Sequence, residues 1–218
     1  MKRLTWSAPI ALLLAVVVAA QAPGVHPISG RRFAPVMGYQ GADWLERSER
    51  DEEEAPDIAL NVLKIPKGAS VADIGAGSGF ITERLSARVG PTGRVFANDL
   101  QPQMLQILGR RLAQRKITNV TLVQGTVDDP KLDPASVDLE IMVDVYHELS
   151  QPQAMLRGLR AALKPGGRLV IVDFPAGSPF PDHPDQKQAE AELASAGYRV
   201  VKTHTFLTGQ YFIELMVR

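Results

Sequence analysis

A glycine-rich turn at residues 75–79 restricts most strongly the folds open to this chain. The turn follows a short apolar run, 71–74, and precedes a segment, 80–89, whose apolar residues recur at helical spacing. Gly75, Gly77 and Gly79 permit a sharp turn and let a ligand approach the backbone closely. This order of strand, turn and helix is typical of nucleotide-binding α/β folds, although a plain turn in such a fold has the same composition.

Residues beside the turn indicate which ligand it suits. A dinucleotide fingerprint would place its third glycine at position 80, where this chain has Phe80. Asp73 lies two residues before the turn, and a carboxylate there favours a ligand with a cationic amino group over a pyrophosphate. The turn therefore argues against a nicotinamide or flavin cofactor.

Short apolar runs alternate with amphipathic segments beyond the turn. This alternation predicts an α/β fold with a doubly wound, mostly parallel sheet. The last two runs are joined by a short link, so we expect those two strands to be antiparallel. The expected strands are 71–74, 94–98, 119–123, 137–143, 168–173, 198–205 and 210–217, and the expected helices are 80–89, 101–115, 151–163 and 185–196.

Polar residues follow the second and third expected strands. Asp99 lies at the tip of the second strand, roughly twenty residues after the glycines, where an acid hydrogen-bonds a ribose diol. Asp99 is equally suited to cap the next helix, and the two roles are compatible. After the third strand, Gly125 leaves space for a flat base, and residues 126–128 carry groups that can bind an adenine edge.

These motifs, in this order, resemble those of the class I S-adenosylmethionine-dependent methyltransferases over residues 60–218. The resemblance implies a Rossmann-like sheet with strand order 3-2-1-4-5-7-6, an antiparallel seventh strand, and S-adenosylmethionine as cofactor. The segment Asp144-Val-Tyr-His-Glu-Leu is most similar to the branch that includes quinone-biosynthesis C-methyltransferases. The other matching motifs are Asp73-Ile-Gly-Ala-Gly-Ser-Gly, Asp99, Gly125 and Leu163-Lys-Pro-Gly-Gly-Arg-Leu-Val-Ile-Val-Asp.

The same resemblance implies which residues hold the methyl donor. The glycine loop would hold the methionine moiety, the acid after the second strand the ribose, and the segment after the third strand the adenine. The predicted cofactor-binding residues are Asp73, Gly75, Ala76, Gly77, Gly79, Asp99, Leu100, Gly125, Thr126, Val127 and Asp144.

The segment after the fourth expected strand supplies the candidate catalytic residues. His147 is the candidate base, because its ordinary pKa suits proton exchange near neutrality. Asp144 is predicted to orient His147 or to contact the donor. The alternative interpretation makes His147 an ordinary polar residue at the start of a loop. A proline-rich loop, 175–184, and a helix around Trp44 are predicted to cover the site.

We expect no metal in the site. The chain has no cysteines, which also excludes the arsenic methyltransferases, and its four histidines are scattered. Metal-dependent O-methyltransferases place acids after the fourth and fifth strands, as Asp144 and Asp173 are placed here. However, Phe174 occupies the position at which that family has an Asn ligand.

The N-terminus has the order of an export signal. Lys2 and Arg3 precede an apolar run, 10–20, and small residues follow it. We predict a signal peptide over residues 1–20, or 1–22, and an exported, periplasmic or membrane-anchored protein. The alternatives are a signal-anchor and a start codon assigned too early, in which case the protein is cytoplasmic. Residues 21–41 are expected to form an extended linker with a solvated Arg31–Arg32 pair. Residues 42–218 form the methyltransferase domain, with a helical cap at 42–64.

Composition limits the partners. The chain has 24 basic and 24 acidic residues, so its formal net charge is zero, which argues against nucleic acid. The expected partner is a small-molecule acceptor, with membrane contact only through an uncleaved N-terminal segment; the sequence predicts no oligomeric state. The predicted function is transfer of a methyl group from S-adenosylmethionine. The alternative is an exported, non-catalytic module on the same fold that binds a nucleoside or a partner.

Overall fold

A seven-stranded sheet in the order β3-β2-β1-β4-β5-β7-β6 organises the computed structural model, which describes residues 24–177 and 182–218. Neighbouring strands are parallel except at β7, which lies antiparallel between β5 and β6. The predicted strand order and the antiparallel seventh strand are confirmed. The strands are β1 Ser70–Ile74, β2 Arg94–Asp99, β3 Val120–Gln124, β4 Val137–Val143, β5 Leu163–Asp173, β6 Tyr198–His204 and β7 Tyr211–Val217.

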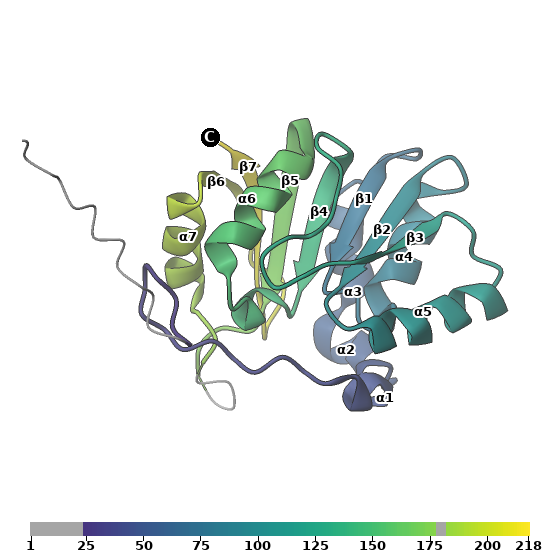
Figure 1. Ribbon diagram of the computed structural model, residues 1–218, viewed down its shortest axis with the longest axis horizontal. Coiled ribbons are helices and arrows are strands. Elements are labelled where there is room, and N and C mark those ends of the chain that lie inside the picture. The colour runs from purple at the N-terminus through teal and green to yellow at the C-terminus, as the bar shows by residue number, and fades with distance from the viewer. Residues whose placement is uncertain (1–23, 178–181) are drawn as a thin grey trace, which may run out of the picture.

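Helices cover both faces of this sheet (Figure 1). Pro56, Pro102 and Pro152 each open a helix, where the missing amide hydrogen costs nothing. The α-helices are α1 Ala42–Leu45, α2 Arg50–Glu54, α3 Pro56–Val62, α4 Phe80–Val89, α5 Pro102–Gln114, α6 Pro152–Ala162 and α7 Gln186–Ser195. Two 3₁₀ turns are η1 Tyr39–Gly41 and η2 Tyr146–Glu148.

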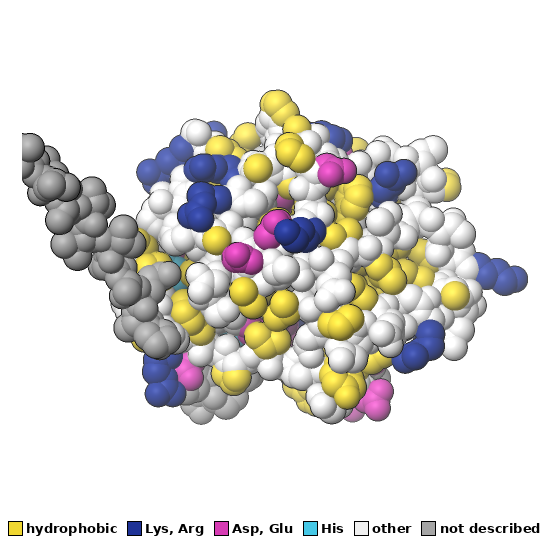
Figure 2. Space-filling model, in the orientation of Figure 1, with side chains coloured by type: hydrophobic (Ala, Val, Ile, Leu, Met, Phe, Trp, Pro, Cys, Tyr) yellow, Lys and Arg dark blue, Asp and Glu magenta, His cyan; other side chains and the backbone are white. Residues whose placement is uncertain are grey.

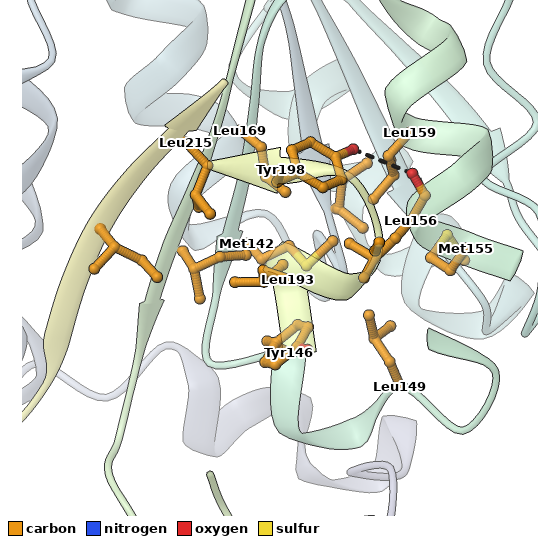
Figure 3. Close-up of a cluster of buried hydrophobic side chains, with 14 of the residues drawn as sticks. Met142, Tyr146, Leu149, Met155, Leu156, Leu159, Leu169, Leu193, Tyr198 and Leu215 are labelled. Carbon is orange, nitrogen blue, oxygen red and sulfur yellow. Dashed lines mark hydrogen bonds between the residues drawn. The ribbon is translucent and has the colours of Figure 1, made fainter. Parts of the chain in front are cut away.

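Two apolar layers hold the helices to the sheet. On one face, α6 and α7 pack over β4, β5 and β7, and Figure 3 shows the side chains of Leu156, Leu159 and Leu193 in this layer. The buried Tyr198 hydroxyl donates to the Leu156 carbonyl at 3.1 Å, so its polar end is satisfied. On the other face, α3 and α4 pack against alternate residues of the same strands, such as Ile141 of β4 and Val170 of β5.

The strand order reverses between β1 and β4. β1 pairs with β2 on one side and with β4 on the other, so the chain leaves these strands in opposite directions across the sheet. In an open parallel sheet, this reversal leaves a crevice at the carboxyl ends of the strands. The fold therefore places the turn after β1 and the turn after β4 at the two sides of one crevice.

Residues 24–41, which we call the N-terminal strap, correct one prediction. The strap has little regular secondary structure, as expected of an extended segment, but it is no free linker. It runs past the carboxyl ends of the strands from α7 to α1 (Figure 1), and His26 and Arg31 are buried. The prediction of a solvated Arg31 was wrong, because Glu192 of α7 binds its guanidinium; Arg32 is exposed, as predicted.

Part of the charged run at the start of the domain is buried as well. The charged run over residues 46–54 is only partly solvated, because Arg50 and Glu54 are enclosed and bind each other at 2.8 Å. The exposed faces carry both signs of charge: Figure 2 shows Lys and Arg side chains spread around one face with Asp and Glu among them.

In the described part of the chain, no helix has the length and apolar character to cross a membrane. The predicted signal peptide and residues 178–181 of the proline-rich loop lie outside the described residues.

Candidate functional site

A pocket of about 220 Å³ opens in the crevice at the carboxyl ends of β1, β2 and β4. The turns after these strands form its sheet side. The opposite wall comes from the strap and α1, through Val36, Met37, Trp44 and Leu45. The position of Trp44 in this wall agrees with the prediction that the helix around it covers the site.

The glycine loop turns as its sequence predicts. Gly75, Gly77 and Gly79 all have positive φ angles, of 73°, 54° and 103°, which residues with a Cβ rarely adopt. The amides of Gly75 and Ala76 each donate to the Asn98 carbonyl at 2.9 Å, which ties the loop to the end of β2. Gly75, Ala76 and Gly77 line the pocket, whereas Gly79 lies behind it.

Asp73 lies beneath this loop and is buried. Its carboxylate accepts a hydrogen bond from the Thr82 hydroxyl at 2.5 Å. Burial raises the pKa of Asp73 to about 7, against the effect of that hydrogen bond. A cationic group placed beside Asp73 would restore its ionised form, because an opposite charge lowers the pKa of a carboxyl. The side chain therefore suits a ligand with a charged amino group, as its position in the sequence predicts.

Asp99 is held by backbone amides at the end of β2 and lines the pocket, where its predicted contact with a ribose stays a prediction. One carboxylate oxygen accepts from the Gly77 amide at 2.8 Å, and the other accepts from the Gln101 amide at 2.8 Å, one residue before α5. Burial raises the pKa of Asp99, and these backbone hydrogen bonds oppose the rise. The carboxylate thus braces both the loop and the start of α5 while it lines the pocket.

The segment after β3 differs from prediction at one residue. Thr126, Val127 and Leu100 all line the pocket, and the apolar side chains of Val127 and Leu100 suit a flat ring. Gly125 does not line it. A Cβ at Gly125 would lie 2.7 Å from the side-chain nitrogen Nδ2 of Asn98 and 3.2 Å from the backbone carbonyl oxygen of Asp129. The glycine therefore makes room for protein atoms. The expectation that Gly125 leaves space for a base was wrong.

His147 belongs to η2, just beyond β4, and its partner is a different acid from the one predicted. Its Nδ1 lies 2.7 Å from Asp173 Oδ1 at the end of β5, and its backbone amide donates to Asp173 Oδ2 at 3.2 Å. Burial acts to raise the pKa of Asp173, but the hydrogen bonds from His147 and His183 lower it below its ordinary value. This ionised, buried carboxylate orients the imidazole.

Asp144 does not orient His147. Its φ angle is +57°, and its carboxylate accepts from Gln210 Nε2 at 2.7 Å and lies 3.6 Å from Arg50 Nη2. Burial raises the pKa of Asp144 well above its ordinary value, and the charges of Asp173 and Glu54 add to the rise. Asp144 lines the pocket, so its predicted contact with the donor stays a prediction.

His183, which no sequence motif indicated, lies against His147. The two imidazole rings are stacked, with centroids 3.6 Å apart and planes 16° apart, and one atom each of His147, Asp173 and His183 lie within 4.8 Å of one another. Three such groups can hold a metal ion. However, an imidazole binds a metal in its ring plane, so two stacked parallel rings cannot both face one ion unless a ring turns. The arrangement fits a hydrogen-bonded His–Asp pair better than a metal centre.

Sequence reasoning also missed Arg50 and Glu148. Arg50 lies in the pocket wall, and the central carbon of its guanidinium, Cζ, lies over the ring of Phe80, 4.2 Å from the ring centroid. Glu148 accepts from the Met37 amide at 3.0 Å, and burial raises its pKa to about 7. Arg50 lies in a stretch rich in charge, where nothing in the sequence distinguishes a buried side chain from a solvated one, and Glu148 follows the candidate base with no pattern that marks it as buried.

The residues of the pocket fit a nucleoside with an amino-acid tail. Asp73 and the glycine loop suit the cationic tail, the Asp99 carboxylate is placed to accept from a diol, and the apolar walls suit a base. His147 and Glu148 lie towards the strap, where an acceptor molecule could meet the donor.

Known proteins share this combination of loop and fold. A family described as "Methyltransferase domain" matches residues 71–167. Ubiquinone/menaquinone biosynthesis C-methyltransferase UbiE of Hahella chejuensis is 32% identical over 108 residues, which cover 49% of this chain and 43% of that protein. Its counterpart in Pseudomonas putida strain KT2440 is 31% identical over 118 residues, covering 54% and 46%. The chain thus spans less than half the length of these relatives.

Solved structures extend the comparison to most of the chain. A SAM-dependent methyltransferase from Aquifex aeolicus has a TM-score of 0.79 and 26% identity, and the match covers 84% of this chain and 100% of that one. A TehB-like SAM-dependent methyltransferase from Corynebacterium glutamicum, at 16% identity and a TM-score of 0.63, shares the fold over 83% of this chain and 98% of its own. By its strand order, its glycine loop and these matches, the chain has the fold of the class I S-adenosylmethionine-dependent methyltransferases and is similar to them in sequence.

Proposed function

We propose that this chain transfers a methyl group from S-adenosylmethionine to a small-molecule acceptor. The observation that best supports the proposal is the glycine loop braced by Asp99, with Gly77 N and Asp99 Oδ2 2.8 Å apart at the mouth of the crevice. S-adenosylmethionine supplies a methyl group on a sulfonium, which is already a good leaving group. The protein therefore contributes chiefly by holding donor and acceptor in line.

The acceptor end supports a base. Asp173 accepts the Nδ1 hydrogen of His147, and this fixes the tautomer in which Nε2 can take a proton. His147 lines the pocket, so an acceptor hydroxyl or acidic carbon at that end would meet this nitrogen. We propose His147 as the base and Asp173 as its orienting partner.

Donor binding is tested by titration calorimetry with S-adenosylhomocysteine. We expect Asp99→Ala to weaken binding by about 1–3 kcal/mol, the usual value of a charged hydrogen bond, or roughly 5- to 150-fold in affinity. Asp133→Ala, an exposed acid outside the pocket, is the matched control. Unchanged affinity in Asp99→Ala would leave Asp99 only as a brace of the glycine loop and the start of α5. Tight binding without turnover on any acceptor would favour a non-catalytic module.

The base is tested on methyl transfer itself. We expect His147→Ala to lower kcat by about 10²–10⁴-fold on an acceptor that must lose a proton, while affinity for S-adenosylhomocysteine stays the same. Asp173→Asn should lower kcat as well, because it removes the charge that stabilises the imidazolium. Full activity of His147→Ala on its acceptor would end the base hypothesis, because positioning would then carry the reaction.

A further inference from the structure

Glu192 of α7 is a fully buried carboxylate at which the strap meets the domain. Arg31 Nε donates to both of its oxygens, at 3.1 and 3.3 Å, and the Tyr146 hydroxyl donates at 2.8 Å. His26 Nε2 lies 3.3 Å away, and the Ser29 hydroxyl also donates to this carboxylate. Three of these four partners belong to the strap. A buried charge needs such partners, so the strap and α7 satisfy each other.

Arg31 also holds the candidate base. Its Nη1 donates to the His147 carbonyl at 3.2 Å, and the Ala34 amide donates to the same oxygen at 3.2 Å. The guanidinium lies 5.5 Å from the ring centroid of Tyr146, the residue before His147. The Arg31 side chain therefore binds both the backbone of η2, at the His147 carbonyl, and the buried Glu192 carboxylate.

The strap continues from Arg31 across the mouth of the pocket. The Met37 amide donates to Glu148, and Gln101 Nε2 donates to the Met37 carbonyl at 2.8 Å. The Tyr39 amide returns a hydrogen bond to Gln101 Oε1 at 3.0 Å. These contacts join the strap to the segments after β4 and β2 in turn, and they hold Met37 in the pocket wall.

We propose that Arg31 is a positioning residue, which fixes the His147 imidazole by docking the strap on η2 and α7. The site is then complete only when residues 24–41 are in place. That His147 acts as a base rests on the proposed function, but its positioning by Arg31 does not. Arg31 touches no reacting atom in this scheme and acts through the His147 backbone.

Nuclear magnetic resonance of the histidine ring protons tests the proposal on the protein without ligands. The chain has four histidines, so their ring signals can be assigned individually. In the wild type, the Nδ1 proton of His147 is buried in its hydrogen bond to Asp173, and we expect a slowly exchanging signal. We expect Arg31→Ala to speed its exchange by about 10-fold or more, because local opening sets exchange. Arg31→Lys, which keeps the charge but not the double grip, should fall between.

Two comparisons separate positioning from general stability. Arg32→Ala removes the exposed neighbouring arginine and should leave the His147 signal unchanged. The ring proton of His204, bound to Glu214 at 2.7 Å in a separate part of the sheet, reports whether the fold is intact in each variant.

A double variant keeps the test decisive if Arg31→Ala does not fold. Arg31→Gln with Glu192→Gln removes both buried charges together, so neither is left unpaired. We expect it to retain the His204 signal, to lose protection of the His147 proton and to become cleavable by protease within the strap. A double variant in which the His147 proton is as well protected as in the wild type would overturn the proposal, whatever the protein does with S-adenosylmethionine.

Discussion

Glu140 lies in the middle of β4 with its carboxyl group completely buried, and neither oxygen has a hydrogen-bond partner among the described residues. Burial raises its pKa well above the ordinary value of 4.5. The folded chain therefore keeps this proton at pH values where the unfolded chain has released it. The contribution of Glu140 to the free energy of unfolding is therefore fully present below about pH 4.5 and is lost as the pH rises above that value.

We expect Glu140→Gln to stabilise the fold relative to the wild type by an amount that grows with pH, because an amide cannot ionise. The difference should increase by about 1.4 kcal/mol per pH unit above the unfolded pKa, until the folded pKa is reached. Urea unfolding from about pH 5 to about pH 8 measures it. The exposed Glu52→Gln is the control. A gain that does not change with pH would show that Glu140 ionises normally in the fold.

At the same scale, the sequence identifies residues better than their partners. His147 and Asp99 closely follow predicted strands, so the pattern of strands is enough to place both at the mouth of the crevice. The acid that orients His147 could not be chosen in this way, because Asp144 and Asp173 both end strands. Asp144 turns away at a positive φ towards Gln210, and no sequence pattern predicts a left-handed aspartate.

Among the elements, α5 packs closely against the start of α4 at Gly79, the last glycine of the loop. A Cβ at Gly79 would lie 2.3 Å from Leu108 Cδ1, and Leu108 is fully buried. The Cβ would therefore force the two helices apart or Leu108 out of its rotamer. Since Gly79 does not line the pocket, its absence of a side chain serves helix packing.

We expect Gly79→Ala to destabilise the fold by more than Gly166→Ala. Both glycines have positive φ, so each alanine costs about 1–2 kcal/mol in backbone strain. Gly166 has no atom within 4 Å of its Cβ position, whereas Gly79 adds about 1–3 kcal/mol of overpacking. Denaturant unfolding measures both, and the cost of Gly79→Ala should shrink in a Leu108→Ala background. Equal costs for the two alanines would contradict close packing of α4 on α5.

The central strands were predictable as short apolar runs, because helices cover both faces of the sheet and β1 and β4 are buried almost throughout. The helices were predictable because burial follows one side of each. Helix 80–89 and strand 137–143 have the predicted bounds. β5 begins at Leu163, five residues before the expected start, because Leu163 pairs with Val137 ahead of a register shift. Gly166 and Gly167 have the composition of a turn, so the sequence predicts that the strand begins after them. The pairing of Leu163 with Val137 cannot be read from the sequence.

At the scale of the molecule, the docking of the strap on the domain could not be predicted from the sequence. Its prolines and glycines have no period, so they indicate a linker, and Arg31 lies 161 residues from Glu192. A contact over this separation leaves no mark on local composition. The sheet was predictable because its rules are local and repeated, whereas docking of the strap depends on contacts with residues far along the chain, such as Glu192 and Glu148.

We propose, from the basic start and apolar run of residues 1–20, that the protein is exported. Mass spectrometry of the protein from its native host should show a chain beginning at Gln21, or at Pro23, because signal peptidases cleave after small residues. Both products retain the whole strap, so cleavage leaves the site intact. An unprocessed chain recovered from the soluble cytosol would contradict export.

The position of β7 has a consequence for how the chain is made. β7 follows the other six strands in the chain, yet it lies inside the sheet, between β5 and β6. Until the ribosome has released Tyr211–Val217, β5 has an open edge, and the apolar Phe212 and Ile213 are missing from the two layers of the core. An unfinished chain is therefore a client for chaperones rather than a folded domain. Late completion of the sheet would suit the export proposed above, because a translocation channel passes an unfolded chain.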